Sequence, residues 1–593
     1  MSDVAADLDV DPESLPVDPF THFDEAASKR HYRGWLSYAF ASEVFVIVSL
    51  TLFLPICLEQ FAQDNGYLLP EKIVPCSSRN PSSPSETSGE LGRCVVKIGW
   101  AWIDTASFSL YIYSISVALQ ALTVISMGGI ANHPPHRKSV LIMFAAIGSI
   151  SAVLFIALPS SSPIWPVAAL LAIAANVGFG ASVVAMNAYL PGLARESKDV
   201  VMALQEYQSA AARSNTSSSP ADSSEIADSD TLGVSEPLLP SEHPIPSTIP
   251  ELAPYREKYS LLLSQATSRI SSFGIALGYA AGIILLLVTL VPVTLMKGST
   301  FALRLAIGCS GIWWAVFTVP AWAWLPDGGK GALKKRVKQD WTLRHEIWKA
   351  WKKLGHMLRP SEIKKLRNTF WYLAAWFLLS DGFTTITSTS ILFAKTSLHM
   401  PASSLILIGV LTPTAGILGS LIWPRVQKYR QWSNRTVLAI LVFMASLLPA
   451  YGCLGFLPFF KEPSPTSGSA TVQAARFGGL TTPAEMFVLA VYFGSVYGAF
   501  QGYARAFYAE LIPPGDEARW YALFSITDKS SSFVGPLVVG LISDLTGNIR
   551  YGFFFLVAMI WAAIPFLLIV DVEKGRADAE TYSIADEESI GQD

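Results

Sequence analysis

Three acidic residues lie in segments whose neighbours are almost all apolar or hydroxylated. They are Glu43 in FASEVFV, Asp381 in FLLSDGFTTITSTS and Asp528 in LFSITDKSSSF. A charge in the middle of a bilayer costs roughly 2.5–3.5 kcal/mol on insertion scales. Each carboxyl group is therefore protonated or faces water or a cation, which places it toward the interior of a helix bundle. A carboxyl group held away from bulk water can exchange a proton, so Glu43, Asp381 and Asp528, in that order, are predicted proton-coupling residues.

An arginine in a similar environment supplies the opposite charge. A free amino acid needs an anion for its ammonium group and a cation for its carboxylate, both as charge-assisted hydrogen bonds. Glu43 or Asp381 can serve the first and Arg505 the second. The other predicted substrate-binding residues offer hydrogen bonds or aromatic surface and are Thr385, Gln501, Asn187, Tyr38 and Tyr497.

Each of these residues also has a structural interpretation that involves no substrate. The alternatives are an ion pair of Arg505 with Asp528 or Glu510, satisfaction of backbone groups by Asp381 at a kink at Gly382, a buried structural acid at Glu43, and a helix cap or bridge at Asn187. Asp528 and Lys529 are adjacent, so we expect their side chains to point to different faces of the helix and not to pair.

Membrane-spanning helices must position these residues. The 593-residue chain is 51% apolar and 15% charged, whereas soluble proteins carry about 25% charged residues. A helix needs about 20 apolar residues to cross a bilayer, and about twelve segments qualify. They lie near 33–58, 104–128, 140–158, 164–190, 269–292, 301–324, 369–393, 403–423, 436–459, 485–511, 519–543 and 549–571. The predicted fold is an all-α polytopic membrane protein.

Two pairs of similar stretches indicate an internal duplication. FGASVVAMNAYLPGLARE resembles YGAFQGYARAFYAELIPPGDEAR, and SRISSFGIALGYAAG resembles DKSSSFVGPLVVG. Two pseudo-symmetric six-helix halves explain both pairs, and this is the plan of the major facilitator superfamily. The predicted regions are an acidic tail at 1–32, an N-terminal half at 33–325, a basic linker at 326–368, a C-terminal half at 369–571 and an acidic tail at 572–593.

The distribution of basic residues predicts the orientation in the membrane. The linker 326–368 holds 13 lysines and arginines against 4 acidic residues, and such loops face the cytosol. Both termini are then cytosolic. Within the linker, DWTLRHEIWKAWKKLGHML predicts an amphipathic helix on the membrane surface. The sequons at Asn215 and Asn434 are also cytosolic, so no glycan is expected.

The loops add two further expectations. Loop 59–103 faces the lumen, where Cys76 and Cys94 form a disulfide if the compartment is oxidising, or remain two unpaired thiols. The cytosolic stretch 197–256 is rich in serine, proline and acidic residues and is predicted to be disordered. Its SEPLL has the form of a di-leucine signal for cytosolic sorting machinery, although chance explains so short a motif equally well.

Several longer motifs resemble one family. GWLSYAFASEVFVIVSLTLFLPICLEQFAQDNG at 34–66, SFSLYIYSISVALQALT at 107–123, FLLSDGFTTI at 377–386 and the motifs within 504–538 are similar to the fungal autophagy-related protein 22 family. The resemblance covers nearly all the predicted spans but not the tails or 197–256. It implies a multi-pass vacuolar membrane protein. It also implies export of leucine and other neutral amino acids to the cytosol after autophagic breakdown, by alternating access with possible proton coupling.

Other functions leave different signatures. The chain contains no GxxxxGK[ST], GxSxG or HExxH pattern, so we expect no enzyme, no nucleotide-driven pump and no cofactor. The HPPH motif is too proline-rich to hold a metal, and no nucleic-acid partner is expected. The expected partners are an amino acid, protons and membrane lipids. The alternatives are a lipid or lysolipid transporter of the same fold, or a membrane receptor that senses amino acids without transporting them.

Overall fold

A computed structural model describes residues 24–69, 72–76, 94–132, 134–217, 253–326, 343–457, 478–513 and 517–590. These residues fall into two compact units. One, the smaller unit, takes its residues from 1–33 and 189–274. The other, the bundle unit, takes its residues from 34–188 and 275–593 and contains all the predicted spans except the start of the first, the end of the fourth and the start of the fifth.

The smaller unit is built from α6 (Leu190–Arg195), α7 (Lys198–Ser217) and the first parts of α1 (Glu25–Val44) and α8 (Ala253–Leu295). Lys258 of α8 pairs with Glu206 of α7 at 2.5 Å. The expectation of disorder over 197–256 is therefore wrong for 198–217. There, apolar residues such as Val200 and Ala203 recur at helical spacing and are buried. The predicted sorting motif lies outside the described residues.

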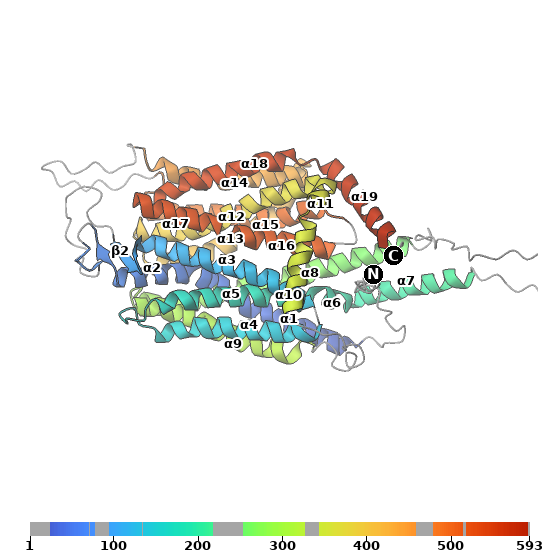
Figure 1. Cartoon of the computed structure of the whole chain (residues 1–593), viewed down its shortest axis with the longest axis horizontal. Helices are drawn as coiled ribbons and strands as arrows, with labels where there is room; N and C mark the ends of the chain where they lie inside the picture. Colours follow the sequence, from blue (N-terminus) through green and yellow to red (C-terminus); the bar gives the residue numbers. More distant parts are fainter. Residues whose placement is uncertain are drawn as a thin grey trace, which may run out of the picture. The chain divides into compact units, whose positions relative to one another are not determined.

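The bundle unit is all helical apart from one small sheet (Figure 1). The helices of its N-terminal half are α1, the π-helical η1 (Phe45–Phe53), α2 (Leu54–Asp64), α3 (Thr105–Asn132), α4 (Pro134–Leu154), the 3₁₀ turn η3 (Phe155–Ala157), α5 (Val167–Asn187), α8 and α9 (Thr300–Trp324). Those of its C-terminal half are α12 (Arg367–Thr396), α13 (Ala402–Arg430), α14 (Asn434–Leu454), α15 (Pro483–Ala509), α16 (Glu517–Ser531), α17 (Val534–Thr546), the 3₁₀ turn η5 (Ile549–Tyr551) and α18 (Gly552–Ile569).

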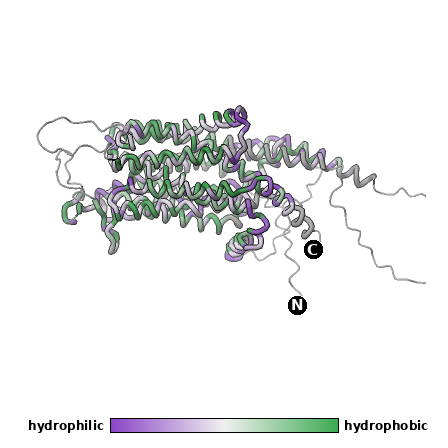
Figure 2. The backbone as a smooth tube through the Cα atoms, turned by 90° about the horizontal axis from the view of Figure 1, so that it is seen from above, coloured by the Kyte–Doolittle hydropathy of each residue, from purple (hydrophilic) through white to green (hydrophobic). Residues whose placement is uncertain are grey.

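This architecture confirms the predicted fold class. Within the described ranges, ten helices are long and apolar enough to cross a membrane, and Figure 2 shows apolar residues along most of their length. The seventh and eleventh predicted spans are the two that are not among these ten helices. The seventh is α12, which carries Asp381 among hydroxyl side chains. The eleventh is broken into α16 and α17, of 15 and 13 residues, and α16 carries Asp528.

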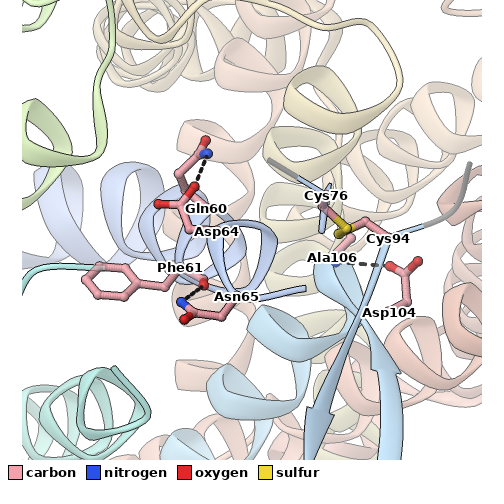
Figure 3. The surroundings of a disulfide bond; sticks show 8 residues. All are labelled: Gln60, Phe61, Asp64, Asn65, Cys76, Cys94, Asp104 and Ala106. Carbon is pink, nitrogen blue, oxygen red and sulfur yellow. Dashed lines mark hydrogen bonds between the residues drawn. A yellow bond between two sulfur atoms is a disulfide. The ribbon is translucent and has the colours of Figure 1, made fainter. Parts of the chain in front are cut away.

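A three-stranded antiparallel sheet lies at one end of the bundle, which we call the sheet end. Its strands are β1 (Tyr67–Leu68), β2 (Cys94–Ile98) and β3 (Ala101–Asp104), in the order β1-β2-β3. Cys76 and Cys94 are joined by a disulfide there, with a Cα–Cα distance of 5.9 Å (Figure 3). The cross-link ties the segment after α2 to the start of β2, the central strand of the sheet. The rest of the loop between the cysteines lies outside the described residues.

The opposite end, the α10 end, carries the helices that flank the C-terminal half. They are α10 (Leu343–Met357), α11 (Pro360–Lys365) and α19 (Val572–Ile590). Trp351 of α10 donates a hydrogen bond to Ser126 of α3 at 3.2 Å, and Trp348 is 68% exposed. The predicted acidic tail is helical up to Ile590, and Tyr582 holds it to Glu362 of α11 at 2.7 Å.

Small residues bring α15 into direct backbone contact with α13. A Cβ on Gly494 would lie 2.2 Å from the Thr412 carbonyl oxygen, and one on Gly498 would lie 2.2 Å from that of Gly416. Glycines at four-residue spacing allow such close helix packing in membranes. By helical spacing, Gln501 and Arg505 lie three and seven residues after Gly498, on the same side of α15 as this contact.

The two halves of the bundle unit meet through α3 and α17. Ser114 of α3 donates a hydrogen bond to the Phe533 carbonyl at 2.7 Å. Closer to the sheet, the backbone N–H of Asp104 donates to the Asp544 carboxylate at 2.9 Å. The halves are thus joined by one hydrogen bond near the sheet and by another at the break between α16 and α17.

Candidate substrate site

Polar side chains from both halves lie within electrostatic range of one another, and we call this group the central cluster. Its members are Glu43 of α1, Tyr113 of α3, Tyr279 of α8, Asp381 of α12, Tyr497, Gln501 and Arg505 of α15, and Asp528 and Lys529 of α16. The helices that supply them include the first, seventh and tenth spans, which the duplicated plan places around a central cavity.

Glu43 stands at the start of a distorted stretch of the first span. The helix changes from α to π form two residues later, at Phe45, and single π segments are frequent at functional sites. The Glu43 side chain packs on α8, because a Cβ on Gly278 would lie 2.5 Å from its Cγ. The cations that act on Glu43 are Lys529 and Arg505. Among the described residues, its carboxylate has no hydrogen bond and no ion pair, so it is available to a ligand.

Arg505 is the exposed member of the cluster. It acts electrostatically on both Glu43 and Tyr279, although it lies on another helix than either of them. The structural alternative for Arg505 is not formed. Glu510 instead pairs with Arg576 at 2.7 Å, and within the described ranges the Arg505 guanidinium forms no ion pair.

Asp381 has a structural task. Its side chain is 2% exposed and accepts hydrogen bonds from the Gly535 N–H at 3.0 Å and from Thr385 Oγ1 at 3.3 Å. Gly535 is the second residue of α17, so the carboxylate caps the helix that restarts after the break in the eleventh span. A negative charge is stabilising at a helix N-terminus. Asp381 thus bonds to the backbone of α17. The sequence had suggested that it would bond to the backbone of its own helix, at a kink.

The close approach at Gly535 yields a first prediction. An alanine Cβ at this position would lie 2.0 Å from Thr385 Oγ1 and 2.8 Å from Asp381 Oδ1. Overpacking of this kind costs about 1–3 kcal/mol, so Gly535→Ala is expected to lower the thermal unfolding midpoint of the purified protein in detergent. Gly502→Ala is the matched control, because its Cβ would meet no heavy atom within 4 Å. Equal midpoints for the two variants would contradict the proposed contact.

Asp528 and Lys529 correct one expectation. Lys529 Nζ lies 3.3 Å from Asp528 Oδ2, although adjacent helical residues point to different faces. The lysine side chain is long enough to bend back over its neighbour near the end of α16. Asp528 also accepts a hydrogen bond from Ser380 of α12. Its carboxylate is therefore already engaged, unlike that of Glu43.

Aromatic residues and an amide form the wall beside these charges. Gln501 donates to the Tyr497 hydroxyl at 2.9 Å, and the Tyr497 ring stacks on Phe383 with centroids 5.5 Å apart. The sequence interpretation overlooked Tyr113 and Tyr279, whose hydroxyls interact with Asp381 and Asp528 and with Glu43 and Arg505, respectively. Tyrosine within an apolar span was the only available signal.

Two other predicted residues differ in placement. Tyr38 is fully buried one and a half turns before Glu43 and interacts with it electrostatically. Its hydroxyl has no hydrogen-bond partner among the described residues. Asn187 is the exposed last residue of α5, and the structure gives no contact between it and the cluster.

A shared motif relates the two acids to the duplication. Ser42-Glu43-Val44-Phe45 and Ser380-Asp381-Gly382-Phe383 have the same serine–acid–any–phenylalanine pattern. In each half, the acid lies against a glycine of the fifth helix of that half, Gly278 for Glu43 and Gly535 for Asp381. The two acids thus occupy equivalent positions in the two halves but have different contacts. Of the two, Asp381 is the one that accepts a backbone hydrogen bond.

The sequence is similar to a family of known proteins along most of its length. A family model described as vacuole effluxer Atg22 like matches residues 27–580. Autophagy-related protein 22 of Cryptococcus neoformans var. neoformans is 42% identical over 578 residues, which cover 93% of this chain and 96% of that protein. Autophagy-related protein 22-1 of Neosartorya fischeri is 38% identical over 581 residues, with 93% and 91% covered.

A solved structure supports the fold alone. The crystal structure of a D-xylose–proton symporter superposes with a TM-score of 0.51 at 12% identity. The match covers 93% of this chain and 99% of the symporter. The chain therefore shares the fold of this symporter.

Proposed function

Because the chain belongs to the vacuole effluxer Atg22-like family, we propose that it exports leucine and other neutral amino acids from the vacuole lumen to the cytosol. The chain is a multi-pass membrane transporter of autophagy with a major facilitator fold. The substrate, the direction of transport and the orientation of the protein in the membrane are parts of the proposal.

The observation that carries the proposal is a pair of opposite charges that the protein leaves unpaired. Glu43 and Arg505 interact across the two halves of the bundle, and among the described residues neither side chain has a bonded partner. In our proposal, Glu43 accepts the substrate ammonium group and Arg505 donates to its carboxylate. Asp381 is the weaker candidate for the ammonium group because it already caps α17. Tyr38, Tyr497, Gln501 and Thr385 would surround the rest of the molecule.

Alternating access gives these residues a transport cycle. The halves are hydrogen-bonded at the sheet end, through Asp104 and Asp544, while Arg505 is exposed. In our proposal, this conformation is the one that exchanges substrate at the α10 end. Movement of one half against the other would close that side and open the sheet end around the same site. A zwitterion bridging Glu43 and Arg505 would draw the halves together during this movement.

Features at the two ends of the bundle support the proposal that the α10 end faces the cytosol and the sheet end faces the vacuole lumen. The α10 end carries the lysine-rich, tryptophan-bearing α10, which suits the cytosolic surface of a membrane with anionic lipids. The sheet end carries the Cys76–Cys94 disulfide, which suits an oxidising lumen. Both termini would then be cytosolic and the vacuole membrane would hold the protein.

Counterflow tests this proposal. Liposomes that contain the purified full-length protein and unlabelled leucine are expected to accumulate labelled leucine from outside, and a lysolipid is expected not to exchange. Leucine binding without counterflow would support the receptor alternative. Exchange of a lysolipid without leucine exchange would support the lipid transporter. Either of these outcomes would contradict the proposed function.

A further inference from the structure

Glu59 is a buried acid that the central cluster does not use. It lies on α2 and its side chain is 1% exposed. Among the described residues, neither of its carboxyl oxygens has a hydrogen-bond partner. Three other buried or half-buried carboxylates of the bundle are bonded: Asp381 to Gly535, Asp528 to Lys529, and Glu485 to Tyr451 and to the backbone. Glu59 therefore lacks the partners that stabilise an ionised group in such a position.

The charged groups around Glu59 do not neutralise it. Lys395 of α12 acts on it favourably, whereas Asp104, at the junction of β3 and α3, and Asp64 of α2 act against its ionised form. Arg304 of α9 faces Cys57 instead. Glu59 forms no ion pair in the part of the chain that the structure describes. An unpaired charge buried in protein costs several kcal/mol, so burial favours the protonated form of the carboxyl group in this conformation.

Glu59 lies where the bundle must open toward the sheet. Its helix α2 packs against α3 and α9 of its own half and against α12 of the other half. The neighbouring acids are part of the same end: Asp64 accepts hydrogen bonds from Gln60 and Thr300, and Asp104 caps α3 close to the disulfide (Figure 3). Separation of α2 from α12 would expose Glu59 to water on the sheet side.

We infer that Glu59 is a proton-binding site that makes closure of the sheet end depend on pH. The carboxyl group takes one proton from the sheet-side compartment when α2 closes on α12, and returns it to the same compartment when that contact opens. Because Glu59 is shielded in the closed conformation, its proton does not cross the membrane with the substrate. The inference extends the proposed function by adding a gate at the far end of its transport cycle.

The direction of the pH effect follows from proton counting. The closed conformation holds one more proton than the open one, so low pH on the sheet side favours closure. An exposed glutamate has a pKa of about 4.3. At pH values above this, Glu59 ionises when it is exposed, so a rise in pH favours opening. One linked proton changes the open-to-closed ratio by at most about tenfold per pH unit. An acidic lumen would thus drive the closing step after a substrate has entered.

A distance measurement tests the gate without any substrate. Trp100 of the β2–β3 turn and Leu545 of α17 are 96% and 76% exposed and belong to different halves. Both are changed to cysteine and spin-labelled, in full-length protein in which the partly exposed free thiols Cys309 and Cys453 are alanine. Between pH 5 and pH 8, we expect the population with the longer label distance to rise. With Glu59→Gln, we expect the short distance at every pH, since glutamine cannot ionise.

Two further variants complete the design. Asp64→Asn is the control on the same helix, because its carboxylate is already hydrogen-bonded. It removes a charge that acts against ionised Glu59, so the pH response should keep its direction and shift only in position, since Glu59 can still ionise. If Glu59→Gln does not fold, Glu59→Met removes the charge with a side chain of similar length. A wild type without pH response, or a neutral variant with the wild-type response, would overturn the inference. Leucine counterflow is measured in parallel, so that failure of the proposed function is seen separately.

Discussion

Replacement of Arg505 by glutamine is expected to reduce leucine counterflow by about 30- to 4000-fold. Loss of one partner of a desolvated, hydrogen-bonded charge pair costs about 2–5 kcal/mol, and each 1.4 kcal/mol is about tenfold in affinity. Since the guanidinium group has no ion-pair partner among the described residues, its removal strands no protein carboxylate. The loss should therefore fall on the substrate, as a higher KM, with the unfolding midpoint nearly unchanged.

Arg576→Gln is the control for this variant. Arg576 pairs with Glu510 at the α10 end, with half of its side chain exposed, and exposed pairs contribute about 0–1 kcal/mol. Its counterflow should match the wild type. If Arg505→Gln kept more than half of the wild-type rate at low leucine concentration, Arg505 would not hold the substrate carboxylate.

Replacement of Glu43 by glutamine is expected to have an effect of similar size. The amide keeps the shape that packs against Gly278 but cannot offer a negative charge to the ammonium group of the substrate. Leucine affinity should fall about 30-fold or more, while the folded yield should be preserved. Initial counterflow rates over a range of leucine concentrations measure this change.

Two comparisons make the Glu43 result specific. Glu206→Gln, which alters an exposed pair with Lys258 in the smaller unit, should behave as wild type. Asp381→Asn should lower the unfolding midpoint more than Glu43→Gln does, because Asp381 accepts the Gly535 N–H. A larger loss of leucine affinity in Asp381→Asn than in Glu43→Gln would reverse the roles assigned to the two acids.

The sequence was sufficient to predict the helices and the acids within them, for a simple reason. Long apolar runs are local features, and an acidic residue inside one is visible without knowledge of the fold. The prediction for Asp381 was incomplete because its partner, Gly535, lies 154 positions away and becomes available only where α16 and α17 separate. Lys529 was misjudged because helical geometry fixes the direction of the Cβ but not the path of a long side chain.

Glu59 illustrates a second limit of sequence reasoning. Residues 59–103 were predicted to be a loop, since hydropathy falls at Glu59, but α2 continues to Asp64. Burial of the carboxyl group arises from packing of α2 against helices that are remote in the sequence. In contrast, α7 was missed although its local pattern is helical, because the serine- and proline-rich residues that follow it dominated the composition of the whole stretch.

Binding of leucine and leucinamide to purified wild-type protein and to Arg505→Gln tests the central charge pairing most directly. Leucinamide keeps the ammonium group but has no carboxylate. We predict that the wild type binds leucine at least about tenfold more tightly than leucinamide, and that Arg505→Gln binds both with the same low affinity. If the variant still preferred leucine by the wild-type factor, the substrate carboxylate would be bound elsewhere and the proposed pairing would be wrong.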